Sequence, residues 1–268
     1  MSVSTFRQLH RKGQPLVVPN PWDAGSARIL QAMGFEALAT TSSGFALTLG
    51  RKDYRVTQEE ALVHAQAVAE SVEIPVTADL ENGFGARPED VYETIRRATQ
   101  IGLAGASIED ATGDASQPLF DLTLAVERIT AAVEAARASA EDFVLTARAE
   151  AFLYGTPDVD EVVQRLARFA EAGADVLYAP GLSDLSDVRA VCALEKPVNV
   201  LVYGALKSKT VDDLATAGAA RISIGGQLAF RAYSAAVEAA SALLNEGSFE
   251  PLTSPSDSIK QVISPLKT

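Results

Sequence analysis

The sequence contains very little cysteine and comparatively little positive charge. Cys192 is the only cysteine among 268 residues, so an intrachain disulfide is excluded and nothing indicates an oxidising compartment. Lys and Arg number 23 against 35 Asp and Glu, which gives a formal net charge of -12. Such an acidic surface repels phosphate backbones and anionic headgroups, which argues against nucleic acid or a membrane as a partner.

Long apolar runs are also missing. No run approaches the roughly 18 apolar residues of a membrane span, and residues 1–13 are polar and basic, without the apolar stretch of a signal peptide. We therefore expect a cytoplasmic protein. Hydrophobic residues make up 47% of the chain, enough for a sizeable core. We expect residues 1–246 to form one domain. The Ser- and Pro-rich segment 247–268 would be a tail that either lacks order or packs against a neighbouring subunit.

Eight short runs of strand-forming residues recur along the chain, and none alternates cleanly between polar and apolar residues. This pattern is typical of parallel strands that are buried on both faces. The eight predicted strands are 16–18, 37–40, 76–78, 106–108, 143–146, 176–178, 198–201 and 222–224.

Helical patterns separate these runs, and four of them end in the same way. A glycine stands just before the next strand, where it can adopt the left-handed conformation that closes a helix. These glycines are Gly34, Gly102, Gly173 and Gly218. Strands that alternate with helices imply parallel pairing and right-handed crossovers. Eight such units predict an α/β fold, a single-domain (β/α)8 TIM barrel. An open, doubly wound sheet is the alternative.

Acidic residues gather at the predicted carboxyl ends of the strands, where active sites of such barrels lie. Asp79 and Glu81 are two residues apart and point the same way on an extended strand end. Glu109 ends the neighbouring strand, about 5 Å away. Three carboxylates at one rim repel one another unless a cation neutralises them, and ligation by oxygen alone favours Mg²⁺ or Mn²⁺. Arg148, at the end of the fifth predicted strand, could hold a substrate carboxylate.

These polar residues also have plain structural interpretations. An acid at a strand end often caps the next helix, and Asp110 and Glu150 could either cap or pair with Arg148. Trp22, after the first predicted strand, could roof the pocket or pack under the first helix. The two histidines and the lone cysteine are interpreted as uninvolved, with His64 placed far from the rim.

Four motifs together resemble the isocitrate lyase and phosphoenolpyruvate mutase superfamily. The resemblance extends from about Pro19 to Gly226, and the motifs after the third and fourth predicted strands are fairly specific. The four motifs are Ser43-Gly44-Phe45, Asp79-Leu80-Glu81-Asn82-Gly83-Phe84-Gly85, Ser107-Ile108-Glu109-Asp110 and Thr146-Ala147-Arg148.

The resemblance implies a Mg²⁺ site, for which Mn²⁺ is an alternative. Asp79 would bind the ion directly, with Glu81, Glu109 and Asp53 contributing largely through water. The shared chemistry of the superfamily passes through a pyruvate-like enolate that the metal stabilises. The residues expected to take part in catalysis are Arg148, Glu109 and Asp53.

The resemblance also implies how the substrate binds and how the subunits assemble. The oxo-acid end would contact the segment 43–45, and the carboxylate or phosphonate would contact Arg148. Members of the superfamily usually assemble as tetramers in which the last helix is exchanged between subunits, so we expect a homotetramer or a dimer. The expected substrate-binding residues are Ser43, Gly44, Phe45, Trp22, Arg148 and Asn199.

The chain departs from this superfamily at its catalytic loop. The carbon–carbon lyases carry a Lys-Lys-Cys-Gly-His loop after the fourth-strand acid, whereas residues 111–118 contain no Cys, Lys or His. The Lys and Asn of the mutases and phosphonopyruvate hydrolases are missing too. Where the lyases have a Glu after the sixth strand, this chain has residues 179–181, Ala-Pro-Gly.

These departures leave several activities open. We expect an enzyme that cleaves a carbon–carbon bond in a small 2-oxo or 2-hydroxy acid, with one or two carboxylates. Decarboxylation of oxaloacetate is the leading hypothesis, because it requires only a Lewis acid and a carboxylate clamp. A lyase that uses Ser116, Asp114 or a water as proton donor comes second. Phosphonate chemistry, by a mutase or hydrolase, comes third. A protein that binds 2-oxo acids without turnover is the alternative from a different class.

Overall fold

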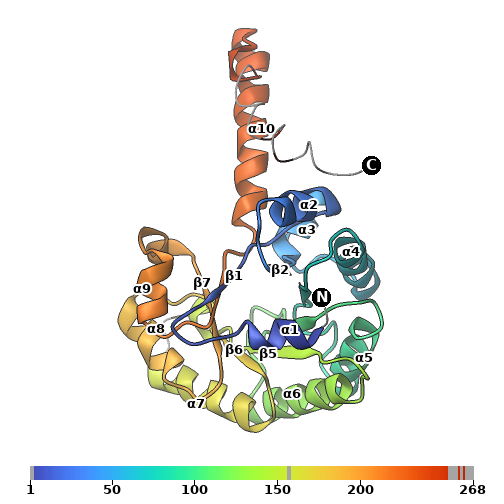
Figure 1. Cartoon of the computed structure of the whole chain (residues 1–268), viewed down its shortest axis with the longest axis vertical. Helices are drawn as coiled ribbons and strands as arrows, with labels where there is room; N and C mark the ends of the chain where they lie inside the picture. The colour runs from blue at the N-terminus through green and yellow to red at the C-terminus, as the bar shows by residue number, and fades with distance from the viewer. Residues whose placement is uncertain (1–2, 156–157, 253–258, 260–261, 263–268) are drawn as a thin grey trace.

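Eight parallel strands form a barrel in the computed structural model, which describes residues 3–155, 158–252, 259 and 262 (Figure 1). Neighbouring strands pair in the order β1-β8-β7-β6-β5-β4-β3-β2. The ring closes where the Ala39 N–H donates to the Pro19 carbonyl oxygen at 3.1 Å. The strands are β1 (Leu16–Val18), β2 (Leu38–Ala39), β3 (Val76–Asp79), β4 (Gly105–Glu109), β5 (Val144–Arg148), β6 (Val176–Tyr178), β7 (Val198–Leu201) and β8 (Arg221–Ser223).

The predicted (β/α)8 barrel is therefore confirmed, and the open sheet is excluded. Each predicted strand overlaps an observed one within two residues at either end. The four glycines before strands all have the left-handed conformation, with φ between 78° and 103°. A side chain with a Cβ is strained there, so glycine at these positions ends each helix and turns the chain into the next strand.

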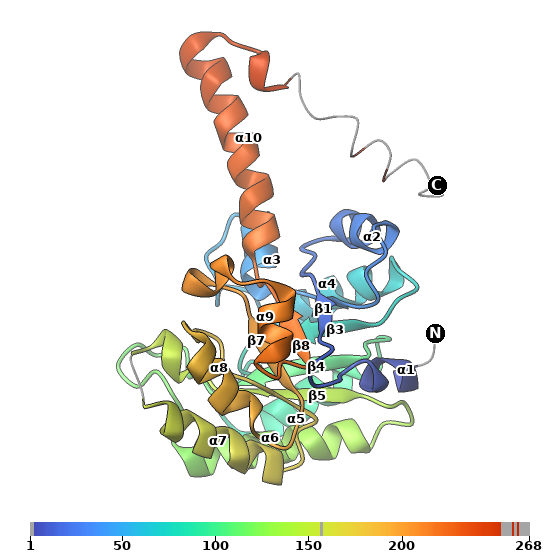
Figure 2. The same cartoon turned by 60° about the vertical axis from the view of Figure 1, so that its left-hand side comes forward.

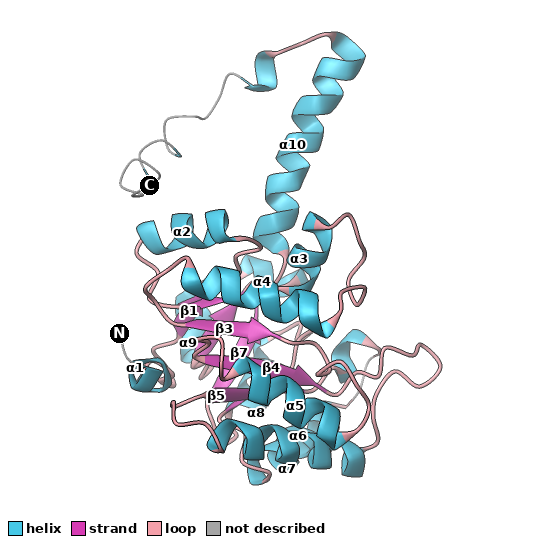
Figure 3. Cartoon of the chain, turned by 90° about the vertical axis from the view of Figure 1, so that its right-hand side faces the viewer, coloured by secondary structure: helices cyan, strands magenta, loops and turns pink. Residues whose placement is uncertain are grey.

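Most helices surround the barrel as an outer layer (Figure 3). The α-helices are α1 (Val3–Gln8), α2 (Ala24–Ala32), α3 (Ser42–Thr48), α4 (Gln58–Glu70), α5 (Pro88–Ala98), α6 (Leu122–Arg137), α7 (Val159–Glu171), α8 (Leu185–Cys192), α9 (Val211–Thr216) and α10 (Gln227–Glu246). The described part of the chain also contains three short 3-10 helices, which are η1 (Ala151–Leu153), η2 (Gly204–Ser208) and η3 (Glu250–Leu252). No helix in the described part of the chain is long and apolar enough to span a membrane.

The last helix, α10, differs from the others because it projects away from the barrel instead of lying along it (Figures 1 and 2). Gly247 ends α10 with φ 64°. The predicted tail 247–268 is described only at 247–252, 259 and 262.

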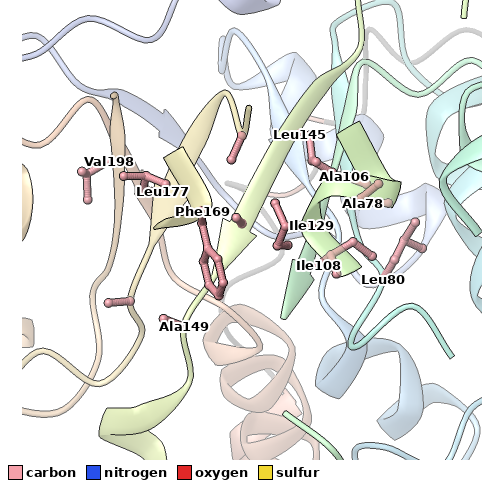
Figure 4. Close-up of a cluster of buried hydrophobic side chains, with 14 of the residues drawn as sticks. Ala78, Leu80, Ala106, Ile108, Ile129, Leu145, Ala149, Phe169, Leu177 and Val198 are labelled. Carbon is pink, nitrogen blue, oxygen red and sulfur yellow. The ribbon is translucent and has the colours of Figure 1, made fainter. Parts of the chain in front are cut away.

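The apolar core lies between the barrel wall and the helices. Ile129 of α6 and Phe169 of α7 lie among strand residues such as Ile108 and Leu177 in this layer (Figure 4). Alternate strand residues face opposite sides, so the intervening residues face the barrel interior. Many of those are polar, and they surround a cavity inside the barrel. Most such barrels instead fill this space with branched apolar side chains. The polar residues that line it from the strands include Thr77, Asp79, Ser107, Arg148, Asn199, Arg221 and Ser223.

Helix α1 closes the barrel at the amino ends of the strands. Phe6 is fully buried there in a second apolar cluster with Leu16, Val144 and Val176. The opposite end, at the carboxyl ends of the strands, carries the acidic residues and the loops that precede the helices.

Candidate active site

A cavity of about 340 Å³ extends from the carboxyl ends of the strands into the barrel. Its size suits a small organic ligand. Residues from all eight strands, and from several of the loops behind them, contribute to its wall. Apolar side chains line one part of it, from Leu153, Leu201 and Phe230, whereas the acidic part is formed by Asp53 and Asp79 beside Arg148.

Arg148 is the centre of the charged part of the cavity. Its Nη1 lies 3.4 Å from Asp79 Oδ1 and 3.2 Å from Glu109 Oε2, and its Nε and Nη2 both donate to Glu150. The guanidinium also lies over the Tyr178 ring, 5.1 Å from the ring centroid. Three carboxylates therefore converge on one cation; Asp79 and Glu109 belong to the predicted trio, whereas Glu150 takes the place expected for Glu81.

Asp79, at the end of β3, is held in place by a backbone donor to its carboxylate and a side-chain acceptor for its N–H. The Ser42 N–H, at the start of α3, donates to Asp79 Oδ2 at 3.1 Å. The Asp79 N–H donates to Thr40 Oγ1 at 3.0 Å. These bonds fix the carboxylate at the edge of the cavity, where Asp53 also lies. Burial, followed by the charge of Asp79, raises the pKa of Asp53 above its usual value.

Glu81 occupies a strained and poorly solvated position. Its backbone is left-handed, with φ 48°, which is costly for a residue other than glycine. The side chain is buried, and its Oε1 has no hydrogen-bond partner. Burial and the charges of Asp79 and Asp53 raise its pKa to about 8. A buried oxygen without a donor is a destabilising arrangement unless a ligand or water completes it.

These acidic groups fit a divalent cation. Their mutual repulsion and the unpaired Glu81 oxygen are both relieved by a positive ion, and an all-oxygen donor set suits Mg²⁺ or Mn²⁺. Within the described residues, no three acidic, histidine or cysteine side chains are close enough to hold an ion together directly. This spacing suits a site in which one carboxylate binds the ion and others act through water.

Glu109 is more deeply buried than Glu81 and is 2% exposed. Burial raises its pKa well above the usual value, with Arg148 opposing that effect. The Tyr54 hydroxyl donates to Glu109 Oε1, and Tyr154 makes a side-chain hydrogen bond to Tyr54. Tyr54 therefore connects the segment after β5 to Glu109 at the end of β4.

The structure separates the predicted substrate-binding residues into two groups. Ser43 and Asn199 line the main cavity. Phe45 instead lines a small adjacent cavity with Asp79 and Glu81. Gly44 is buried at the start of α3, where a Cβ would lie 3.2 Å from the Trp22 Cβ.

Trp22 does not line the main cavity. Of its two sequence interpretations, the structure therefore supports packing, because its Cβ lies close to Gly44 behind the cavity wall.

The interpretation of the histidines as uninvolved was wrong in its placement of His64. The His64 ring stacks on Phe45 with 3.9 Å between centroids, and it lines the small cavity with Glu81. His10, from the opposite end of the barrel, contacts Arg221 at 3.4 Å. Cys192 is buried, and burial raises the pKa of its thiol to about 12, as expected of a core residue.

The two acids with an alternative interpretation make ion pairs. Glu150 pairs with Arg148, as one alternative held. Asp110 pairs instead with Arg165 at 3.0 Å and accepts the Glu150 N–H. Neither side chain caps a helix.

Sequence reasoning missed Tyr54, Tyr178 and Arg221. Tyr54 directly follows the predicted residue Asp53, so its position in the loop was the available signal. Tyr178 and Arg221 lie inside short apolar runs. No local pattern distinguishes an inward-facing from an outward-facing residue in a strand buried on both faces.

Comparisons with known proteins agree with this fold and site. A family model described as phosphoenolpyruvate phosphomutase matches residues 6–244. A solved structure from Burkholderia cenocepacia J2315, assigned provisionally as a lyase/mutase, is 44% identical, covers 99% of this chain and 96% of its own, and superposes with a TM-score of 0.93.

Two relatives have more specific names. The 2-methylisocitrate lyase of Escherichia coli (strain K12) is 28% identical over 244 residues, which cover 87% of this chain and 81% of the relative. The structure of oxaloacetate acetylhydrolase in complex with the product oxalate is 26% identical, with a TM-score of 0.85 and coverage of 98% of this chain and 94% of that one.

Proposed function

The chain belongs to the phosphoenolpyruvate phosphomutase family, and we propose that it is a Mg²⁺-dependent lyase that cleaves a carbon–carbon bond in a small 2-oxo or 2-hydroxy dicarboxylic acid. Relatives in this family include enzymes named as lyases. Decarboxylation of oxaloacetate or a closely related acid is the reaction that we favour.

The convergence of Asp79, Glu109 and Glu150 on Arg148, at the edge of a cavity, carries this proposal. Such a cluster is expensive to bury, because neighbouring negative charges repel one another. A barrel with a purely structural role gains no stability from such a cluster. A site that binds a cation and an anion together needs charges of both signs in one place.

Asp79 would hold the metal ion directly, with Asp53, Glu81 and Glu109 supporting it through water. Mn²⁺ could replace Mg²⁺, because both ions prefer oxygen ligands. When bound, the ion would act as a Lewis acid on the 2-oxo group and lower the energy of the charge that develops there as the bond breaks. Asp79 is preorganised for this role by the Ser42 N–H and the Glu81 N–H, which both donate to its carboxylate.

Arg148 and Ser43 would orient the substrate. Glu150 occupies the Nε and Nη2 side of the Arg148 guanidinium. The Nη1 side lies 3.2 Å from Glu109 and 3.4 Å from Asp79, at the cavity edge, and is the part that would face a substrate carboxylate. Ser43, at the start of α3, lines the same cavity and can donate its hydroxyl to the oxo-acid end.

The loop after β4 favours decarboxylation over a lyase reaction that uses a loop acid. Asp114 and Ser116 are both exposed, and they hydrogen-bond to each other at 2.8 Å. Neither lines the main cavity. Decarboxylation needs no protein acid at the moment of bond cleavage, since the electron pair is accepted by the oxo group and a proton can arrive later from water.

Calorimetry of the Mg²⁺-loaded protein against a panel of 2-oxo acids, with pyruvate release followed in the same samples, tests this function. We expect binding that requires Mg²⁺, turnover of one dicarboxylate, and loss of both in Arg148→Ala. Arg189→Ala, an exposed arginine on α8, serves as the charge-matched control and should behave as wild type. Binding without turnover of any acid would contradict the lyase and favour a binding protein. Turnover of phosphonates alone would favour a mutase or hydrolase.

We also propose that the protein forms a homo-oligomer, a dimer or tetramer, through α10. This helix projects from the barrel and exposes Phe230, Val237 and Leu244, at 52%, 63% and 85%. Large exposed apolar side chains on one projecting helix are typical of a protein interface. Val237→Glu should lower the mass measured by light scattering, and an unchanged monomeric mass in both proteins would contradict the proposal.

We place the protein in the cytoplasm, because its single cysteine is buried and unpaired.

A further inference from the structure

Arg221 is a second cation in the same cavity, and its surroundings differ from those of Arg148. It is the first residue of β8, lines the cavity and is 4% exposed. Within the described part of the chain no carboxylate forms an ion pair with it, whereas Arg148 pairs with three. Its guanidinium is therefore a buried charge without a counter-ion.

Among the described residues, the hydrogen-bond partners of the Arg221 side chain are neutral groups. Nε donates to Asn199 Oδ1 at 2.9 Å, Nη2 donates to Thr146 Oγ1 at 3.0 Å, and Nη1 lies 3.4 Å from His10 Nε2. His10 does not supply a charge, because burial and the neighbouring Arg221 lower its pKa to about 3. Burial lowers the pKa of Arg221 to about 10, so the guanidinium remains protonated at neutral pH.

These contacts leave one N–H on each terminal nitrogen without a partner among the described residues. A guanidinium has five N–H donors, of which three are engaged here. A pair of free donors on the two terminal nitrogens suits the two oxygens of a carboxylate. An unpaired buried charge is strongly destabilising, so its retention in a cavity wall indicates that an anion completes it.

The position of Arg221 places this anion at the far end of the cavity from the acidic cluster. Arg148, Tyr178, Asn199 and Arg221 are register partners on four successive strands, β5 to β8. Arg148 lies at the end of its strand, whereas Arg221 begins its strand and contacts His10 near the helix that closes the barrel. The cavity therefore has an acidic end near the rim and a cationic end deep in the barrel.

We propose that Arg221 binds the distal carboxylate of a dicarboxylate substrate and so selects dicarboxylates over monocarboxylates. The inference rests on the proposed function, in which the 2-oxo acid end lies at the acidic cluster. Thr146 and Asn199 then act as positioning residues, because they hold the guanidinium toward the cavity.

Binding measurements on Arg221→Gln test this assignment. Gln keeps a polar side chain near Asn199 and Thr146 but removes the charge. With Mg²⁺ present, we expect affinity for oxaloacetate and 2-oxoglutarate to fall about 100-fold, corresponding to ~3 kcal/mol. Affinity for pyruvate and 2-oxobutyrate should change less than about twofold. Arg221→Lys should recover part of the loss, and Arg189→Gln, on the exposed face of α8, should match wild type.

A second measurement does not depend on the metal or on turnover. Succinate, a dicarboxylate without an oxo group, should raise the melting temperature of the metal-free wild type and leave that of Arg221→Gln unchanged. Equal stabilisation of both proteins, or stabilisation of neither, overturns the subsite. If the Mg²⁺-loaded wild type binds no 2-oxo acid but succinate still discriminates the variants, the proposed function fails and the anion subsite stands.

Discussion

The two ends of the barrel hold buried carboxylates in opposite electrostatic states. At the amino ends of the strands, Asp175 accepts from Arg7 at 2.5 Å, from Arg137 at 2.6 Å and from the Leu145 N–H at 2.8 Å. Burial alone would raise the pKa of Asp175, but hydrogen bonds from the two arginines hold it below the usual value. At the carboxyl ends, the buried Glu81 and Glu109 both have raised pKa values.

This contrast separates stability from function within one small domain. At the amino end, Asp175 is paired with Arg7 and Arg137, so the protein itself neutralises this carboxylate when the chain folds. The carboxyl end has more acids than cations and is completed only when a ligand binds. Buried charges that the protein itself leaves unsatisfied are expected at a functional site, because their cost is offset by binding.

The largest expected effect is on activity, from Asp79→Asn. Removing the charge that holds the cation should lower kcat/KM about 1,000-fold, which corresponds to ~4 kcal/mol of transition-state stabilisation. Folding should be unaffected or slightly improved, because one of several repelling charges is gone. Steady-state kinetics and urea denaturation on the same preparations check this. Retained activity would show that Asp79 does not bind the metal ion. Asp175→Asn is the control, and it should keep its activity when it is assayed under conditions in which it is folded.

The next largest effect is on stability, from Asp175→Asn. Leaving Arg7 and Arg137 without their shared partner should lower the free energy of unfolding at pH 7 by ~3 kcal/mol. Because the folded-state pKa of Asp175 is depressed, its contribution is present above the pKa of the unfolded chain and is lost as the pH falls through the folded value.

The stability curves of the wild type and Asp175→Asn should therefore converge in acid, below about pH 4. Asp142→Asn is the matched control, since Asp142 also pairs with Arg7 but its side chain is 35% exposed. It should cost less than ~1 kcal/mol. An equal loss in both variants would contradict the comparison.

The smallest effect has the opposite sign and comes from Glu81→Gln in metal-free protein. The pKa of Glu81 is raised from 4.5 to about 8, so the folded state keeps a proton that the unfolded chain releases. Stability should therefore fall as the pH rises through this window. The variant lacks that slope and should be more stable at pH 8 by on the order of 2 kcal/mol.

Urea denaturation in the presence of a chelator between pH 5 and pH 8 measures the difference between Glu81→Gln and the wild type. Added Mg²⁺ should reduce it, because the ion takes over the role of the missing proton. Parallel stability curves across this pH range would show that folding does not raise the pKa of Glu81.

Most of the candidate site was predictable because barrel topology converts positions in the sequence into positions in space. Once the eight strands were recognised, the residues at their ends had to meet at one rim, which brought Asp79, Glu109 and Arg148 together. The contacts within that rim were less predictable. The sequence left open whether Glu150 caps a helix or pairs with Arg148, as it does, and Trp22 does not line the main cavity.

The residues that the sequence did not reveal lie on the inner face of the barrel strands or in loops. Arg221 begins a strand in which every residue is buried, and it lies beside His10 because α1 closes the barrel from below. Tyr54 reaches Glu109 across 55 positions of sequence. Neither contact leaves a local signal, since each depends on how a loop or helix returns to the barrel.

The sequence by itself determined the barrel, its strand order in the chain and the composition of its acidic rim, because buried parallel strands, helix-ending glycines and turn positions are local properties. Only the tertiary structure decided which charges are paired and which are not. That depends on distances of a few ångströms between side chains from different strands, over which the Coulomb energy of a buried pair changes by several kcal/mol. The local sequence does not show that Asp175 is paired, that Glu81 is crowded by other acids or that Arg221 is unpaired. The fold decides each of these.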